Sequence, residues 1–177
     1  AEKYVGGLIG NLQALHSIEL NNVNVKAPVR GGQDVGGLVG HACVAHATVN
    51  GALVSSVVSG SVSVGGSFGY LGYPMPGAKI TFDCESRPVR YVVKSSADAE
   101  VKGDTYVGGM IGYYDASYVE MNIKGQVEIA VNLMGGSNVG GAFGYAAELL
   151  TFNPYKINFS STTMRVEASD SNAGGVV

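Results

Sequence analysis

The chain has 177 residues, of which 46% are hydrophobic and only 14% charged, against roughly 25% charged in ordinary globular domains. Its net charge is −3 and it has no basic run, which argues against a nucleic-acid partner, and no stretch of 18 apolar residues is present to span a bilayer. Glycine accounts for 27 residues, about twice its usual share, and tryptophan is absent.

A glycine-centred motif begins near the N-terminus and recurs along the whole chain. Each copy reads Val-Gly-Gly, then a variable residue, a large apolar residue and a further Gly. The valines and paired glycines of the five intact copies are Val5, Gly6 and Gly7; Val35, Gly36 and Gly37; Val64, Gly65 and Gly66; Val107, Gly108 and Gly109; and Val139, Gly140 and Gly141. A sixth copy begins at Ala173 and lacks the last glycine. Successive copies start 30, 29, 43, 32 and 34 residues apart, a period that is typical of solenoids and short for propeller blades.

We expect each motif copy to be a strand. Its first and fifth positions, such as Val107 and Ile111, share parity and so point to one face. Two buried columns follow from this, one made of the valines and one made of Ile9, Val39, Phe68, Ile111 and Phe143. The fourth position, which varies from Leu8 to Ser67, is expected to point the other way, where packing is less demanding.

Two further short strands are expected after each motif copy, because apolar and polar residues alternate there. The second strands are expected at 18–20, 47–49, 80–82, 119–121 and 157–159, and the third at 23–25, 127–131 and 164–166. Three short strands per repeat predict an all-β fold, a β-solenoid (β-helix) of about five coils of roughly 30 residues. The whole chain, 1–177, is expected to be a single repeat domain.

These motif copies resemble the GLUG-motif repeats of bacterial surface proteins, which carry a V-G-G-[LM]-[IV]-G core at a period of about 30 residues. Copies 1, 2 and 4 match this core, whereas copies 3 and 5 depart from it at Ser67-Phe68 and Ala142-Phe143. The resemblance covers essentially the whole chain. It implies an extracellular repeat region of the kind found in adhesin-like proteins, and it supplies no catalytic residues.

The third repeat carries a loop-rich insertion at about 71–100, which explains the period of 43 residues. Loops that project from a rigid repeat often carry recognition, and a tolerated surface excursion is the alternative. Asn158 begins the one Asn-x-Ser/Thr sequence of the chain, so it is a possible N-glycosylation site or else an unmodified surface residue.

The residue after each intact motif forms a further column, which runs Asn11, His41, Tyr70, Tyr113 and Tyr145. Stacked coils would bring the tyrosine rings to about 4.8 Å from one another. The column is then either a possible aromatic ladder that stabilises the stack or a strip that binds carbohydrate.

Catalytic and metal-binding patterns are missing from the sequence, so we expect no enzyme activity and no cofactor. His16, His41 and His46 lack Cys, Asp or Glu partners at metal-ligand spacing and are interpreted as solvated turn residues. Cys43 and Cys84 fall in different columns of adjacent coils, which favours two free thiols over a disulfide.

Neither end of the repeat array carries a polar cap, so we expect its open strand edges to meet further solenoid, end to end, in a longer chain or in another copy of itself. The sequence therefore predicts an extracellular or cell-surface structural protein that forms a rigid stalk, fibre or surface filament. The alternative is an adhesin module that binds glycans or host molecules through the third-repeat insertion or the tyrosines.

Overall fold

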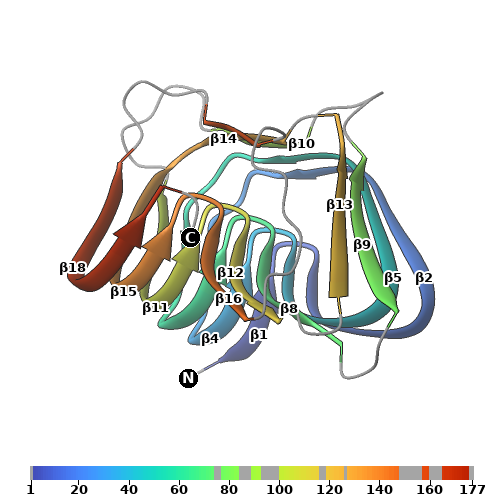
Figure 1. Ribbon diagram of the computed structural model, residues 1–177, viewed down its shortest axis with the longest axis horizontal. Coiled ribbons are helices and arrows are strands. Elements are labelled where there is room, and N and C mark those ends of the chain that lie inside the picture. The colour runs from blue at the N-terminus through green and yellow to red at the C-terminus, as the bar shows by residue number, and fades with distance from the viewer. Residues whose placement is uncertain are drawn as a thin grey trace.

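The computed structural model describes residues 2–73, 77–83, 89–92, 100–115, 119–125, 127–147, 157–159 and 165–175. Side chains are not described at 14–15, 83, 89–92, 119–120 and 157–159. The described chain is all strand and turn, with no helix, and it forms a β-solenoid of about four turns, slightly fewer than the five coils expected (Figure 1). The all-β class and the solenoid architecture are thus confirmed.

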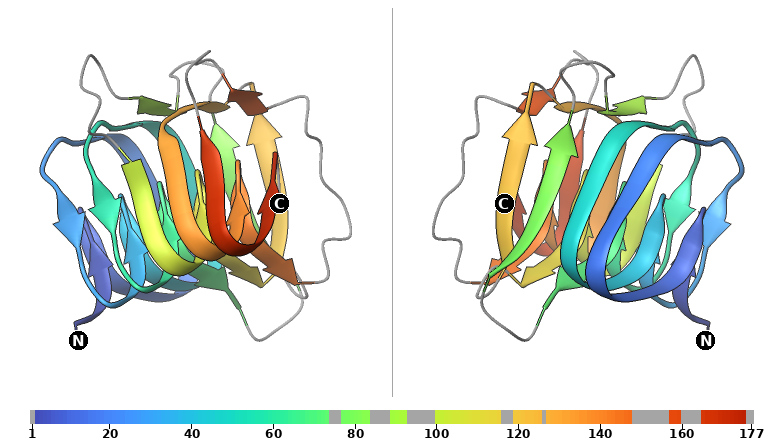
Figure 2. Two further views of the ribbon diagram at one scale, coloured as in Figure 1. Left: turned by 90° about the vertical axis from the view of Figure 1, so that its left-hand side faces the viewer. Right: turned by 90° about the vertical axis from the view of Figure 1, so that its right-hand side faces the viewer.

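One wall of the solenoid, which we name sheet A, is an eight-stranded parallel sheet. Its main strands run in the order β1 (Lys3–Gly6), β4 (Gln33–Gly36), β7 (Val62–Gly65), β11 (Glu100–Gly108), β15 (Asn132–Gly140) and β18 (Val166–Gly174), and the short strands β3 (Val29–Arg30) and β6 (Val58–Ser59) pair beside them. Figure 2 shows these strands stacked side by side across the molecule.

The second wall, sheet B, is a ten-stranded sheet that is also parallel. It contains β2 (Ile9–Val25), β5 (Val39–Val54), β8 (Phe68–Gly72), β9 (Ala78–Asp83), β10 (Val89–Val92), β12 (Ile111–Asp115), β13 (Val119–Lys124), β14 (Val127–Ala130), β16 (Phe143–Ala147) and β17 (Ile157–Phe159). In the first repeat the expected second and third strands are continuous, because β2 runs through both without a break. In the second repeat β5 likewise continues beyond the expected second strand at 47–49 as far as Val54, where no third strand was predicted.

The motif copies pair in register along the stack. In sheet A the first-position residues pair as Val5, Val35, Val64, Val107, Val139 and Ala173. In sheet B the fifth-position residues pair as Ile9, Val39, Phe68, Ile111 and Phe143. Every member of the two predicted columns from copy 2 to copy 5 is at most 1% exposed, so the two buried columns exist.

The motif itself is a corner and not a strand, which corrects the sequence expectation. In copy 4, β11 ends at Gly108 and β12 begins at Ile111, so Val107 and Ile111 belong to different sheets. Backbone pairing still continues around the bend, since the N–H groups of Met110 and Ile111 both donate to the carbonyl oxygen of Ala142, at 2.9 and 3.1 Å.

These corners lie in the core, which explains their glycines. A Cβ added to Gly37 would lie 2.7 Å from Cγ1 of Val54, and one added to Gly109 would lie 2.9 Å from Cγ2 of Ile129, on the opposite wall. Only a residue without a side chain allows such an approach. For the same reason the fourth position is buried: Leu38, Ser67, Met110 and Ala142 are all 0% exposed, contrary to expectation.

The residue before each motif valine redirects the chain into the corner. Tyr4, Asp34, Ser63, Tyr106, Asn138 and Asn172 all have φ between 51° and 59°, in the left-handed region. We call these six residues the left-handed column. Asn and Asp adopt this conformation at little cost, whereas Tyr and Ser are strained by it. Sequence analysis had not identified this column.

A second set of glycines lies four residues before the motif valines, at Gly31, Gly60, Gly103 and Gly135. A Cβ on Gly103 would lie 2.7 Å from Cγ2 of Val64, and one on Gly135 would lie 2.9 Å from Cγ2 of Val107. The valine column therefore packs over this glycine column, and the repeat is better described as Gly-x-x-x-Val-Gly-Gly.

The register of the later strands differs from expectation at three places. Val166, expected in a third strand at 164–166, opens β18 in sheet A, where it pairs with Leu133. Met121, and not Val119, lies opposite Ile80. Ile157 pairs with Val127, so 157–159 belongs to the third-strand column rather than to the second. Within the expected insertion, 78–83 and 89–92 form β9 and β10, which pair with β5. Apart from Gly77, the other residues of 74–99 lie outside the described part of the chain.

Candidate functional site: a tyrosine-walled groove

The sites of interest lie where sheet A and sheet B meet at the corners. A Cβ added to Gly112, the last motif glycine of copy 4, would lie 2.5 Å from the backbone carbon of Ser63 in the preceding copy. The two sheets therefore touch backbone to backbone there. This contact sets the left-handed column of sheet A directly beside the residues that follow the motif in sheet B.

The residues that follow the motif form the aromatic column, which we define as His41, Tyr70, Tyr113 and Tyr145. Their ring centroids are 4.5 Å apart for His41–Tyr70, 5.6 Å for Tyr70–Tyr113 and 5.0 Å for Tyr113–Tyr145. The interplanar angles of 7°, 15° and 26° make all three pairs stacked. The ring faces are therefore used within the column, and ring edges and hydroxyls remain for other contacts.

Two tyrosines of the left-handed column pack against this stack. Tyr4 lies 4.7 Å from His41, and Tyr106 lies 5.3 Å from both Tyr113 and Tyr145. In the two copies between them, the left-handed column carries the short side chains of Asp34 and Ser63. The missing volume leaves a groove that has Tyr4 at one end and Tyr106 at the other.

This groove has a volume of about 410 Å³, which falls in the range of small-ligand sites. Its lining consists of aromatic and polar residues with one aliphatic side chain, namely Tyr4, Gln33, Asp34, His41, Val62, Ser63, Tyr70, Tyr106 and Tyr113. No lysine or arginine is among them.

The most polar feature of the groove is a pair formed by His41 and Asp34. His41 Nδ1 lies 2.8 Å from Asp34 Oδ2, and Asp34 is only 4% exposed. The other carboxylate oxygen, Oδ1, has no hydrogen-bond partner among the described residues. His41 is thus a strand residue of β5 with a stacked ring and a carboxylate partner, which corrects its interpretation as a solvated turn residue. His16 and His46 also lie on strands, β2 and β5, where they are exposed.

Burial and nearby negative groups affect the titration of this strip. Burial, followed by the Asp115 carboxylate, raises the pKa of Tyr70 from 10.0 to about 12. Burial is also the main reason why the pKa values of Tyr113 and Cys43 are raised. These three groups therefore keep their protons at neutral pH, and Cys43, a free thiol, is not activated as a nucleophile.

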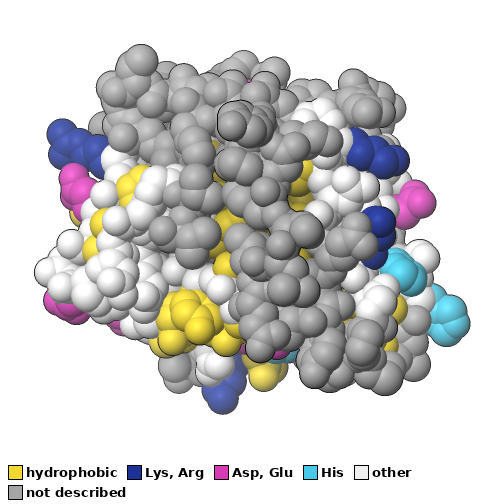
Figure 3. Space-filling model, viewed as in Figure 1, with side chains coloured by type: hydrophobic (Ala, Val, Ile, Leu, Met, Phe, Trp, Pro, Cys, Tyr) yellow, Lys and Arg dark blue, Asp and Glu magenta, His cyan; other side chains and the backbone are white. Residues whose placement is uncertain are grey.

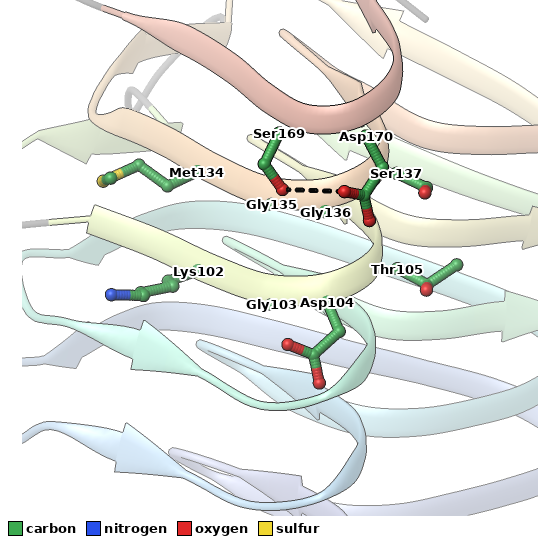
Figure 4. Close-up of a pocket in the computed structure, with 10 residues that line it drawn as sticks. All are labelled: Lys102, Gly103, Asp104, Thr105, Met134, Gly135, Gly136, Ser137, Ser169 and Asp170. Atoms are coloured by element: carbon green, nitrogen blue, oxygen red, sulfur yellow. Dashed lines mark hydrogen bonds between the residues drawn. The ribbon is translucent and has the colours of Figure 1, made fainter.

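A second hollow lies on the bend of sheet A, where β11, β15 and β18 run side by side (Figure 4). Its volume is about 560 Å³. A Cβ added to Gly136 would lie 2.7 Å from the backbone carbonyl oxygen of Asp104 and 3.1 Å from Oδ2 of Asp170. Ser169 Oγ donates a hydrogen bond to Asp170 Oδ1 at 3.4 Å. A β-bulge accompanies it, because Ser169 and Asp170 together oppose Gly136.

The structure does not test the two remaining site predictions, Asn158 and Cys84, at the level of side chains. Asn158 lies in β17, where its backbone pairs with Glu128, and its side chain is outside the described residues. Cys84 is likewise outside them. In the part of the chain that is described, no group of three or more His, Cys, Asp or Glu side chains could hold a metal ion, and no helix is long and apolar enough to cross a membrane. On the face shown in Figure 3, charged side chains are scattered rather than gathered into one patch.

Sequence reasoning found the wall of the groove formed by the residues after the motif, but it missed the groove because it did not consider the residues before the motif. Tyr4, Asp34, Ser63 and Tyr106 share a position but not a residue type, so no repeated chemistry marked them. A geometric argument could have identified these four residues. At a tight buried corner, the residue before the motif lies close to the residues that follow the motif.

No family model matches this chain, and neither a curated protein nor a solved structure is similar to it.

Proposed function

We propose that this protein is an extracellular structural solenoid, which contributes a rigid segment to a stalk, fibre or surface filament. The observation that supports this proposal best is the unbroken register of the motif through all six copies in sheet A. Backbone hydrogen bonds continue around the corners, and buried glycines let successive corners touch. Such a stack resists bending because each layer is bonded to the next along its whole length.

The edge at copy 1 supports a partner along the stack axis. Leu8 is 49% exposed and Tyr4 is 37% exposed, whereas Leu38, the equivalent of Leu8 in copy 2, is completely buried. The apolar face that each copy covers in the interior is thus open at copy 1. A further solenoid layer, from the same chain or from a second copy, would cover it and pair with the free strand edge. The resemblance to GLUG-motif repeats of surface proteins agrees with this role.

Sedimentation velocity and electron microscopy test stacking between copies. We expect the purified chain to form end-to-end particles as its concentration rises, and Leu8→Lys to suppress them, because a lysine on an edge strand disfavours pairing. Ser61→Lys adds the same charge at an exposed position in the middle of the stack and should leave assembly unchanged. A chain that stays monomeric at every concentration, with or without Leu8→Lys, would contradict stacking between copies.

Glycan binding by an adhesin module is the second candidate. One observation favours it: the groove between Tyr4 and Tyr106 is lined by aromatic side chains and by polar side chains, and Oδ1 of Asp34 among these has no hydrogen-bond partner among the described residues. The aromatic column alone does not favour it. Its rings stack on one another, so their faces are not free to pack on a sugar ring, and the column is better explained as a stabilising ladder.

A further inference from the structure

We propose that the groove between Tyr4 and Tyr106 binds one neutral sugar unit of a glycan. This inference rests on the glycan-binding candidate and is independent of stacking. It places recognition in copies 2 and 3, at residues that precede the motif, and not in the third-repeat insertion or on the faces of the tyrosine ladder.

The shape of the groove suits a compact ligand. Tyr4 and Tyr106 are three layers apart, or roughly 14 Å at the usual strand spacing of about 4.8 Å. The two short residues between them, Asp34 and Ser63, provide the depth. A single sugar unit over Asp34 and Ser63 would be shorter than the groove and would pack against the tyrosine at one end, where the ring can contact sugar C–H groups and the hydroxyl can bind sugar oxygens.

The polar groups of the groove match a ligand that carries several hydroxyls. Asp34 Oδ1 is an acceptor without a partner on a residue that is 96% buried, as its 4% exposure shows. Gln33 adds an amide and Ser63 a hydroxyl, each of which can donate and accept. Sugar hydroxyls also donate and accept, so they can satisfy this mixed set, whereas an apolar ligand would leave the carboxylate oxygen unpaired.

The charge and the ring orientation exclude the main competitors. No lysine or arginine is among the described residues that line the groove, and the one basic side chain, His41, is already paired with the carboxylate of Asp34, so an anionic ligand would find no free cationic partner. An organic ammonium ion is bound best where open ring faces surround it. The faces of His41, Tyr70 and Tyr113 are stacked against one another, which leaves mainly their edges and hydroxyls.

The equivalent positions further along the stack show that this site is local. In copies 5 and 6 the left-handed column carries Asn138 and Asn172, and Asn172 Nδ2 donates to Asn138 Oδ1 at 3.0 Å. The side-chain oxygen of Asn138 thus accepts a hydrogen bond from the next layer, whereas Asp34 Oδ1 does not have such a partner. The pair Asn138–Asn172 therefore serves as an internal control for a left-handed residue without a ligand.

The test is NMR titration of the full 177-residue chain with neutral trisaccharides at millimolar concentration, with amide shifts as the readout. The probes are maltotriose, cellotriose, laminaritriose, mannotriose and chitotriose, and choline chloride represents organic ammonium ions. We expect at least one trisaccharide to shift the amides of Asp34, Ser63 and Tyr70 and to leave those of Asn138 and Asn172 in place.

Two substitutions and a matched control assign the effect to the groove. Asp34→Asn keeps the size and the tolerance for a left-handed backbone, and it should weaken binding about tenfold or more through loss of the carboxylate. Tyr106→Asn removes one end of the groove and relieves a strained backbone, so it should fold and bind several-fold more weakly. Asn138→Asp makes the reverse exchange outside the groove and should leave the affinity unchanged.

Three results would overturn the proposal: no trisaccharide shifts the groove amides, choline shifts them while every sugar fails, or Asp34→Asn binds as tightly as the native chain. Failure of this kind is distinguishable from failure of the structural role. Sugar binding is read at Asp34 in copy 2, whereas stacking is read by sedimentation of Leu8→Lys.

Discussion

At the residue scale, the left-handed column decides where each turn of the solenoid bends. Six residues of four different types adopt nearly the same φ, so the backbone of the stack imposes this conformation and the side chains tolerate it to different degrees. Asn and Asp tolerate it best because their short polar side chains bond to nearby backbone.

Asn138 offers a direct measure of this conformational demand. We expect Asn138→Ala to lower the free energy of unfolding by about 1–2 kcal/mol, because alanine is strained at φ of 54°. Asn138→Gly should cost clearly less, although it loses the same hydrogen bond to Asn172. Urea unfolding of the two variants measures the difference. Asn24→Ala, at an exposed site in β2, is the control, and an alanine variant as stable as the glycine variant would count against backbone strain.

The motif glycines carry a second residue-scale prediction. A Cβ added to Gly108 would lie 2.6 Å from the amide nitrogen of Gly144 and would also press on the carbonyl oxygen of Ile111. Because backbone atoms of two layers would have to move, Gly108→Ala should lower the free energy of unfolding by more than about 3 kcal/mol. Gly175→Ala, where an added Cβ meets nothing within 4 Å, should change it little. Thermal unfolding of both variants checks this, and equal midpoints would refute the buried corner.

Sequence reasoning reached part of this residue-level picture. It identified the valine column and the fifth-position column, because large apolar residues recur there in every intact copy. It misplaced the fourth position because it counted parity along an extended strand, and parity fails once the chain turns at Gly7 and its equivalents. It did not find Asp34, because the left-handed column has a shared backbone geometry and no shared chemistry.

At the element scale, parallel strand pairing in both sheets holds the successive layers of the solenoid together, and the aromatic column adds side-chain stacking between layers at one position. Three successive stacked ring pairs connect β5, β8, β12 and β16. Sequence reasoning placed the second strands of the first three repeats in the correct register, and it put the third strands that begin at Val23 and Val127 in one column, but it misplaced 119–121 and 157–159. Short apolar-polar-apolar triplets such as 119–121 recur at several offsets, and an offset of two residues preserves which face is buried.

The aromatic column has a pH signature. The folded-state pKa of Tyr70 is about 12, against 10.0 for an ordinary tyrosine, so the unfolded chain loses this proton first as the pH rises. Stability contributed by the neutral hydroxyl is therefore complete below pH 10 and is lost between about pH 10 and pH 12. Tyr70→Phe should make this decline shallower. Urea unfolding across that range measures it, and an identical decline in both proteins would contradict the buried position of the hydroxyl.

At the scale of the whole molecule, the repeat period identified the solenoid and the glycines explain how it packs. In each turn of the solenoid the Gly-Gly corner lies inside the core. Glycine is needed there because even a Cβ atom would collide with neighbouring backbone or side chains. The period alone could not show this inward corner, since Gly-Gly pairs are equally common in surface turns.

Amide hydrogen exchange at the corners tests this account most directly. If the corners are buried and the backbone ladder passes through them, the amides of Gly37, Leu38 and Met110 should exchange as slowly as those of Val49 and Ile80 in the buried strands. NMR of the native chain in deuterated buffer gives each rate separately. Corner amides that exchange as fast as those of Ser56 and Val57 in a part-exposed bend would contradict it, because the Gly-Gly motif would then be a surface turn.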